Sequence, residues 1–281
     1  MQITSSIRDI VERALVEDLG HGDVTTDALI PTDARGQAVV VVKADGVVAG
    51  LEVALEVFRQ VDASTRGAIH VPDGTAVSPG DVVADVEGSV AGILKAERVA
   101  LNFLQRLSGI ATATAAYVRA VQDTKARIID TRKTVPGLRQ LEKYAVRAGG
   151  GHNHRYNLAD GILIKDNHIA ALRARELGLE EIVDLARQRS PHTLRIEIEV
   201  ETVEEAVEAL DAGADAVLLD NMSPEEMRRV VEISGGRALL EASGGVTLDT
   251  VRAVAETGVD LISVGALTHS VRALDISLDL G

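Results

Sequence analysis

The first 120 residues mix helical and strand-like spacing of their apolar positions. Apolar residues recur every three to four positions over 7–19 and over 51–61, which predicts two amphipathic helices. Short runs rich in Val, Ala and Ile predict strands, and turn signals such as Pro72-Asp73-Gly74 separate them. The expected strands are 36–44, 68–71 and 81–88. A long amphipathic stretch, 94–121, follows, with Ser108-Gly109 as a candidate break. We therefore expect a small α+β domain closed by a long helix.

From about residue 125 the pattern becomes strand, loop and helix in repetition. Six apolar runs predict strands at 126–130, 161–166, 194–200, 216–221, 238–243 and 261–266. Helices are expected at 138–147, 203–211, 224–233 and 248–256. Parallel strands joined by helical crossovers form either an α/β barrel or an open doubly wound sheet. A polar or small residue ends each strand in turn: Asp130, Lys165, Glu199, Asp220, Ser243 and Gly265. Because the strand ends of a barrel meet at one mouth, this series favours the barrel.

Composition narrows the class of protein. The 281 residues include only two Phe and three Tyr, with no Trp or Cys, so the core must be aliphatic and disulfides and thiolate chemistry are excluded. No apolar run approaches the roughly 18–20 residues of a membrane span, and no signal peptide is visible. The net charge of −14 argues against a nucleic-acid partner. We expect a cytoplasmic protein with neither a membrane nor a nucleic acid as its partner.

The charge is unevenly distributed. Residues 125–175 hold eleven Lys/Arg and four Asp/Glu, a local balance of +7 in an acidic chain. Within this stretch, Arg132 and Lys133 follow a predicted strand, where a planar guanidinium and a compact ammonium suit phosphate and carboxylate groups. Lys165 leaves a buried strand and needs an anionic partner there. These positions favour a pocket for a highly anionic small molecule over the alternative, a solvated basic loop or helix face.

A glycine run, Gly149-Gly150-Gly151, lies in the same basic stretch. Its backbone is free to approach a ligand closely, and His152, His154 and Arg155 follow it with additional donors. The alternatives are a helix cap followed by a flexible link, and zinc binding by the two histidines. For zinc, the sequence offers no obvious complementary ligands.

Two further groups of residues carry candidate chemistry. Glu199 and Asp220 end predicted strands, where they suit Mg²⁺ coordination, stabilisation of a cationic transition state, or structural salt bridges. Glu197 shares the strand parity of Glu199. The loops 242–247 and 264–269 follow late strands with small residues, and their backbone N–H groups suit a phosphate. The residues alone thus predict a barrel binding a phosphorylated, multiply anionic substrate with a divalent cation, and they leave the reaction open.

Motifs along nearly the whole chain resemble those of the quinolinate phosphoribosyltransferase family. They are GDVTT (22–26), AERVALNFLQRLSGIAT (96–112), DTRKT (130–134), GLR (137–139), KYAVRAGGGHNHR (143–155), ILIKDNH (162–168), LLDN (218–221), EASGG (241–245) and VGALTHS (264–270). The one departure is Ala242, where the family more usually has serine. The resemblance implies an N-terminal α/β sandwich domain, 1–112, and an incomplete seven-stranded α/β barrel, 113–270, with the tail 271–281 packing back on the first domain.

The resemblance also implies a reaction. The phosphoribosyl group of phosphoribosyl pyrophosphate would be transferred to quinolinate with loss of CO₂ and pyrophosphate, giving nicotinate mononucleotide for NAD biosynthesis. The implied catalytic residues are Lys133, Lys165, Glu199 and Asp220. Of these, Glu199 and Asp220 would face the ribose and its Mg²⁺, directly or through water. Lys133 would serve quinolinate or the pyrophosphate.

Substrate binding is assigned by the same resemblance. The residues implied for quinolinate are Arg132, His154, Arg155 and Lys165, and Thr131 is implied as a further substrate-binding residue. Those implied for the 5-phosphate are Ser243, Gly244, Gly245, Val264, Gly265 and Ala266. Arg98 would reach quinolinate from the other subunit of a homodimer; its plain alternative is an exposed helix residue paired with an acid such as Glu97.

Three other interpretations stay open at this point. A paralogous phosphoribosyltransferase of the molybdenum-locus type would share the fold. A phosphate-binding barrel isomerase or synthase would carry out proton transfer independent of magnesium and phosphoribosyl pyrophosphate. A non-catalytic binding protein would keep the phosphate loops without needing magnesium-facing carboxylates.

Overall fold

The structure, a computed structural model, describes residues 1–281, and these fall into two units. The first unit comprises Met1–Ala115, Thr134–Gly150 and Ala266–Gly281, and the second comprises Ala116–Lys133 and Gly151–Gly265. Helix α4 (Val90–Ala120) begins in the first unit and ends in the second. The division differs from the one expected at residue 112, because residues 134–150 and 266–270 cluster with the first unit.

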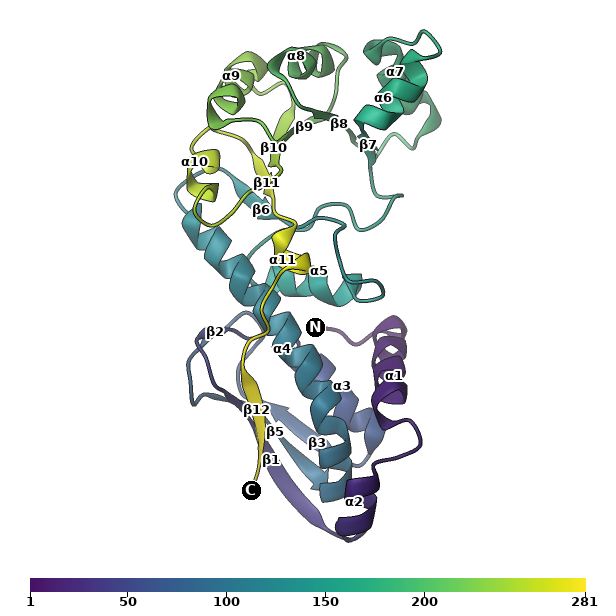
Figure 1. Cartoon of the computed structure of the whole chain (residues 1–281), viewed down its shortest axis with the longest axis vertical. Helices are drawn as coiled ribbons and strands as arrows, with labels where there is room; N and C mark the ends of the chain where they lie inside the picture. Colours follow the sequence, from purple (N-terminus) through teal and green to yellow (C-terminus); the bar gives the residue numbers. More distant parts are fainter. The chain divides into compact units, whose positions relative to one another are not determined.

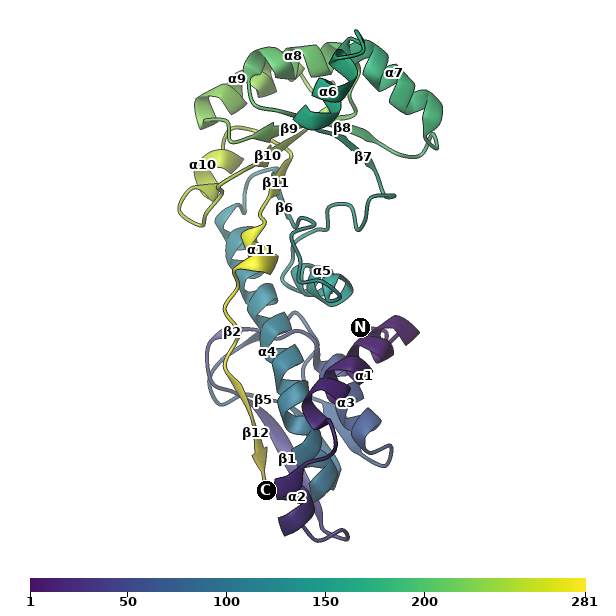
Figure 2. The same ribbon diagram turned by 45° about the vertical axis from the view of Figure 1, so that its right-hand side comes forward.

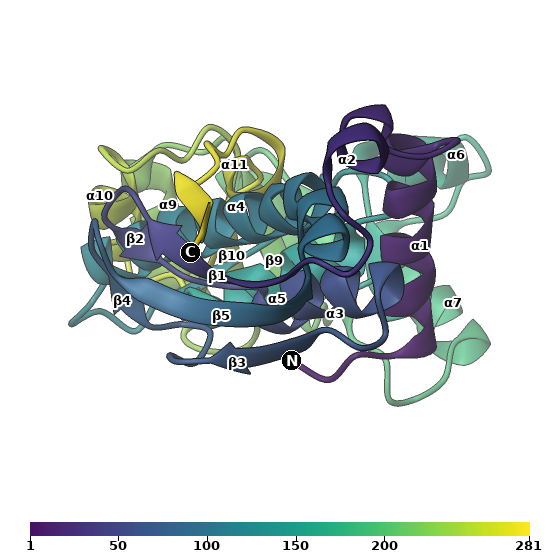
Figure 3. The ribbon, with the colours of Figure 1, turned by 90° about the horizontal axis from the view of Figure 1, so that it is seen from below.

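An antiparallel sheet organises the first unit. Its order is β12-β1-β5-β3, formed by β12 (Ile276–Leu280), β1 (Arg35–Val42), β5 (Val82–Ser89) and β3 (Arg66–Ile69). The C-terminal residues return to this sheet, where β12 pairs with β1 from Ala38 opposite Leu280 to Val42 opposite Ile276. Figure 3 shows β1, β5 and β3 with helices α3 (Leu51–Val61) and α4 on one side of them. The remaining elements of this unit are α1 (Ser5–Leu19), α2 (Val24–Leu29), β2 (Gly46–Val47), β4 (Ala76–Val77), α5 (Arg139–Ala148) and α11 (Ala266–His269).

Helix α4 is continuous for 31 residues, so the break considered at Ser108-Gly109 is absent. Both residues have packing roles instead. The Ser108 hydroxyl accepts a hydrogen bond from the backbone N–H of Ala49 at 3.0 Å. A Cβ on Gly109 would lie 2.1 Å from the backbone oxygen of Arg272, so only glycine lets the segment before β12 approach the helix. The residue types that suggested a turn are required here by close contact.

The second unit is built on a sheet of six parallel strands. Its order is β6-β11-β10-β9-β8-β7, formed by β6 (Arg127–Ile129), β11 (Leu261–Ser263), β10 (Leu239–Ser243), β9 (Ala216–Asp220), β8 (Ile196–Val200) and β7 (Ile162–Ile164). Beyond β6, the backbone of His152 makes a single parallel bridge with Ile129. This bridge occupies the place of a seventh strand, and no pairing joins it to β7. The barrel is therefore incomplete between these two edges.

Helices line the outer face of this sheet. They are α6 (Asp166–Arg173), α7 (Leu179–Arg189), α8 (Val203–Asp211), α9 (Pro224–Ser234) and α10 (Val251–Ala255). Figures 1 and 2 show α7 to α10 following one another along that face. Along β8, Ile196, Ile198 and Val200 are buried, whereas Glu197 and Glu199 have the opposite parity and point to the barrel interior. No helix of the chain combines the length and apolar character needed to cross a membrane.

Candidate active site

A cavity of about 440 Å³ lies at the carboxyl ends of the parallel strands, within the size range of small-molecule pockets. All of its lining residues belong to the second unit. They are Thr131, Arg132, Lys133, His154, Arg155, Leu163, Lys165, Glu199, Leu218, Asp220, Glu241, Ser243 and Ser263. The cavity therefore brings together every residue expected to bind quinolinate within one subunit and both candidate magnesium ligands.

The loop that carries His154 and Arg155 is held by Asp130, which directly follows β6 and is fully buried. One oxygen of Asp130 accepts the backbone N–H of His154 at 2.8 Å, and the other accepts the side-chain amide of Asn153 at 2.6 Å. The guanidinium of Arg155 donates to the backbone oxygen of Gly161 at 3.1 Å, which fixes the far end of the loop. The missing barrel strand is thus replaced by a hydrogen-bonded loop that delivers two functional side chains.

The surroundings of Arg155 disfavour its positive charge. Burial, followed by the nearby guanidinium of Arg132, lowers its pKa, and Glu197 partly offsets this. Arginine remains charged despite such a shift. Two guanidinium groups held near each other at the edge of a cavity favour an anion between them.

The acidic side of the cavity lies at the ends of β8 and β9. The ammonium of Lys165 forms an ion pair with Glu199, so the anionic partner expected for this lysine is present. Lys165 is the residue before α6, and its backbone N–H donates to Nδ1 of His168 at 2.9 Å, which fixes the start of the helix. At the end of β9, Asp220 accepts a hydrogen bond from the side chain of Asn221 at 2.8 Å.

Only part of the two loops expected to hold phosphate lies at the cavity. Gly244 and Gly245 have φ of +90° and +59°, and a Cβ on Gly244 would lie 2.2 Å from Oδ1 of Asn221. Glycine is therefore required there for both conformation and space. The backbone N–H of Val264 donates to Ile129 at 3.0 Å in the sheet, so it is not available to a ligand. Of the six residues expected at the 5-phosphate, only Ser243 lines the cavity.

The glycine run expected to approach a ligand has a packing role at its first residue. A Cβ on Gly149, in the glycine run, would lie 2.4 Å from the backbone oxygen of Ala111, so this glycine allows α5 to pack against α4.

Arg98 lies on α4 in the first unit and does not line the cavity. It is exposed and makes no hydrogen bond or ion pair within the chain, so the pairing with Glu97 is absent.

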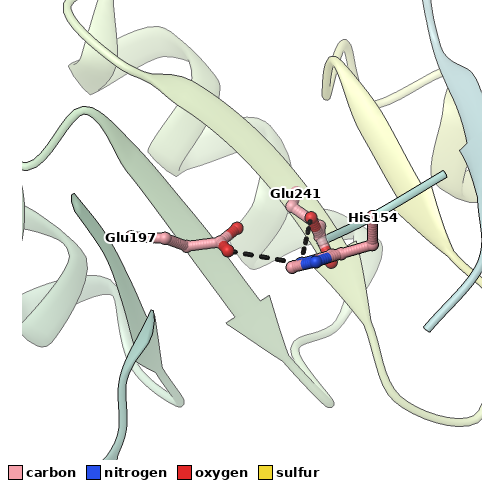
Figure 4. A group of neighbouring side chains, drawn as sticks. All are labelled: His154, Glu197 and Glu241. Carbon is pink, nitrogen blue, oxygen red and sulfur yellow. Dashed lines mark ion pairs between the residues drawn. The ribbon is translucent and has the colours of Figure 1, made fainter. Parts of the chain in front are cut away.

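His154 lies between Glu197 and Glu241 (Figure 4), and of these three residues His154 and Glu241 line the cavity. Nε2 of His154 is 3.3 Å from Oε2 of Glu197 and 3.6 Å from Oε2 of Glu241. Burial, followed by the charge of Glu197, raises the pKa of Glu241 well above its usual range. Sequence reasoning missed Glu241, although it has the parity of Ser243 on the same strand and so points to the interior.

This group contains three potential metal ligands within 4.8 Å of one another. Its hydrogen bonds argue against a metal ion. Nδ1 of His154 accepts the backbone N–H of Arg155 at 2.7 Å, whereas a metal-bound imidazole uses its second nitrogen as a donor. The neutral ring therefore carries its proton on Nε2, which faces the two carboxyl groups.

An incomplete α/β barrel with a cationic and acidic pocket at the carboxyl ends of its strands belongs to the class of α/β-barrel proteins that bind multiply anionic small molecules. The family model of the quinolinate phosphoribosyl transferase C-terminal domain matches residues 110–279, and that of the N-terminal domain matches residues 23–108. The chain belongs to the quinolinate phosphoribosyltransferase family.

Individual relatives agree over the full length. The chain is 44% identical over 274 residues to the probable nicotinate-nucleotide pyrophosphorylase (carboxylating) of Bacillus subtilis, a match that covers 98% of this chain and 93% of the relative. It is 44% identical over 279 residues to the nicotinate-nucleotide pyrophosphorylase (carboxylating) of Mycobacterium leprae, covering 97% and 96%. The crystal structure of NadC from Streptococcus pyogenes superposes with a TM-score of 0.95 at 41% identity, covering 100% of this chain and 99% of that one.

Proposed function

We propose that this chain transfers the phosphoribosyl group of phosphoribosyl pyrophosphate to quinolinate, releasing pyrophosphate and CO₂ and giving nicotinate mononucleotide. The observation that carries the proposal is the single cavity in which Arg132, Arg155 and Lys165 face the strand-end carboxylates Glu199 and Asp220. A dicarboxylate needs cationic surroundings, and a sugar that develops positive charge needs anionic surroundings beside them. Relatives at 44% identity are named for the same reaction.

Quinolinate is assigned to the cationic side. Burial and then repulsion from Arg132 lower the pKa of Arg155, and an anion beside the two guanidinium groups would offset both effects. Each guanidinium offers a planar fork to a carboxylate. Lys165 provides a compact charge, and its pairing with Glu199 holds it at the boundary between the two sides. Thr131 and His154 complete the wall of this pocket.

The ribose is assigned to the acidic side. As pyrophosphate leaves C1 of the ribose, the ring develops positive charge, which the fixed carboxylates of Glu199 and Asp220 stabilise. Their oxygens are also the ligand type that Mg²⁺ prefers, and they end neighbouring strands, so these two residues fit a magnesium site with direct or water-mediated contacts. Bound Mg²⁺ would supply charge neutralisation of the pyrophosphate, and Lys133 would add to it.

The remaining groups complete the binding of phosphoribosyl pyrophosphate. Ser243 lines the cavity beside the positive-φ glycines of its loop, which suits a 5-phosphate bound by backbone N–H groups. After the pyridine nitrogen of quinolinate has bonded to C1, the pyridinium ring accepts the electron pair of the breaking bond as the 2-carboxylate leaves as CO₂. A proton then replaces it on the ring carbon. No covalent enzyme intermediate is required.

We assign Arg98 to the pocket of a second subunit in a homodimer. Its exposed guanidinium has no partner within the chain, and the cavity of its own chain is lined without it. A further cation from a partner subunit would add to the neutralisation of the quinolinate dicarboxylate.

The test is to incubate purified protein with quinolinate, phosphoribosyl pyrophosphate and Mg²⁺, and to measure nicotinate mononucleotide and CO₂. Both products should form in equal amounts, and omission of Mg²⁺ should abolish them. Absence of product at high enzyme concentration refutes the proposal. Product from a different acceptor, without CO₂, would favour a paralogous phosphoribosyltransferase.

A further inference from the structure

Two carboxyl groups that the reaction does not use lie beside His154: Glu241 lines the active-site cavity, and both Glu197 and Glu241 line a second cavity of about 420 Å³. Glu197 lies one interior position before Glu199 on β8, and Glu241 lies one interior position before Ser243 on β10. Side chains at corresponding depth on alternate strands of a barrel form one layer, so the curvature of the sheet brings this pair together across β9. Figure 4 shows both acids directed at the ring of His154.

The surroundings of Glu241 disfavour an ionised carboxylate. Its side chain is only 2% exposed, and its Oε1 has no hydrogen-bond donor. Its Oε2 lies 3.6 Å from Nε2 of His154, which is long for a charge-assisted hydrogen bond. The hydroxyl of Ser263 is the side-chain hydrogen bond that favours the ionised form of Glu241. Burial and the second acid nearby outweigh it, because a buried carboxylate costs far more free energy than a neutral carboxyl group. The raised pKa of Glu241 has the same two causes, burial first and Glu197 second.

The tautomer of His154 agrees with this distribution of protons. Because Nδ1 accepts the backbone N–H of Arg155, the ring is neutral and cannot compensate two negative charges. With both acids ionised, two negative charges would lie beside His154, which lines the site assigned to a dicarboxylate. With Glu241 neutral, the pair carries a single negative charge.

We propose that Glu241 is a positioning residue of the quinolinate pocket, held as a neutral carboxylic acid beside Glu197 and His154, and that this neutrality is required for a dicarboxylate to bind in the cavity that Glu241 lines. The inference rests on the proposed function for the identity of that dicarboxylate. Glu241 acts through its neighbours: its neutral carboxyl group hydrogen-bonds with Glu197, and Glu197 in turn accepts from Nε2 of His154.

The groups that face Glu241 come from every neighbouring element. They are Glu197 from β8, Leu218 from β9, Ser263 from β11, Asp130 from the end of β6, and His154 from the loop. No lysine or arginine is among the groups that shift the pKa of Glu241. Ionisation at alkaline pH would therefore place an uncompensated charge at the cavity. We expect quinolinate affinity to fall as the pH rises through the elevated pKa of Glu241.

The experiment compares wild type with Glu241→Gln, a permanently neutral isostere, and with Glu56→Gln as a control. Glu56 is also a buried glutamate, but it lies on α3 in the first unit. Quinolinate binding is measured by calorimetry from neutral to alkaline pH. Wild type and Glu56→Gln should lose about tenfold or more in affinity over this range. The loss of affinity between neutral and alkaline pH should be smaller for Glu241→Gln than for wild type, whatever the affinity of this variant at neutral pH.

A second measurement detects the protonated carboxyl group of Glu241 directly. The infrared spectrum of wild type should contain the C=O stretching band of a buried protonated carboxyl group, and this band should be missing in Glu241→Gln only. An alkaline profile of Glu241→Gln that matches wild type, or a band that persists in this variant, overturns the inference. The infrared measurement needs no substrate. Its result therefore stands even if wild type makes no nicotinate mononucleotide, which would refute the proposed function alone.

Discussion

Replacing Lys165 by alanine separates the roles of this residue in binding and in stability. In the structure its ammonium pairs with Glu199, and its side chain is 43% exposed. An ion pair with such access to water contributes about 0–1 kcal/mol to the free energy of unfolding. In the complex with quinolinate the same ammonium would be covered by the ligand, and removal of one partner of a buried charge pair costs about 2–5 kcal/mol. The variant should therefore bind quinolinate about 30-fold to several thousand-fold more weakly.

The assay is calorimetric titration of quinolinate, with thermal melts of the same samples. Lys125→Ala is the matched control, because Lys125 forms a comparable ion pair with Asp260 at 2.8 Å in the same unit and does not line the cavity. We expect both variants to lose at most about 1 kcal/mol of stability, while only Lys165→Ala loses affinity. Equal quinolinate affinity in the two variants would refute the assignment of Lys165 to the substrate.

Three further predictions concern the dimer, the phosphate loop and the long helix. Arg98→Ala and Lys165→Ala should each be nearly inactive. After the two variants are unfolded and refolded together, about one quarter of wild-type activity should return, because half of the dimers are mixed and each mixed dimer has one intact site. If confirmed mixed dimers have only background activity, Arg98 does not complete the site of the partner subunit. Gly244→Ala should raise the KM for phosphoribosyl pyrophosphate much more than that for quinolinate, since its Cβ would displace the side chain of Asn221; equal changes would argue against a phosphate loop. Gly109→Ala should destabilise the protein by about 1–3 kcal/mol or more in denaturant titrations, because its Cβ would overlap a backbone oxygen before β12; unchanged stability would contradict the contact.

The sequence predicted much of the second unit because its pattern is local. Helix α8 has the expected bounds, 203–211, and the strands β8, β9 and β10 begin and end within two residues of expectation. Apolar periodicity marks such elements because one face of each is buried. Helix α6 has no buried residue, and its apolar residues Ile169 and Leu172 are only half-buried; it was not anticipated.

The candidate site was predictable where a polar residue ends a strand, and it was not predictable inside the barrel. Lys165, Glu199 and Asp220 stand out because a charge follows an apolar run. Glu241 carries the same parity signal, but its meeting with Glu197 depends on strand order and sheet curvature, which no local pattern reveals.

The pairing of β12 with β1 has a consequence for how the chain folds. Val40 pairs with Leu278, so this edge of the first sheet joins residues from opposite ends of the sequence. During synthesis, β1 leaves the ribosome long before β12, so the edge of β1 that pairs with β12 stays unpaired until the end of the chain is made. Non-local strand pairings of this kind form slowly, and exposed strand edges promote association between chains. We therefore expect the second unit, whose strands pair mostly with neighbours in sequence, to become protected in pulsed hydrogen exchange before β1 does.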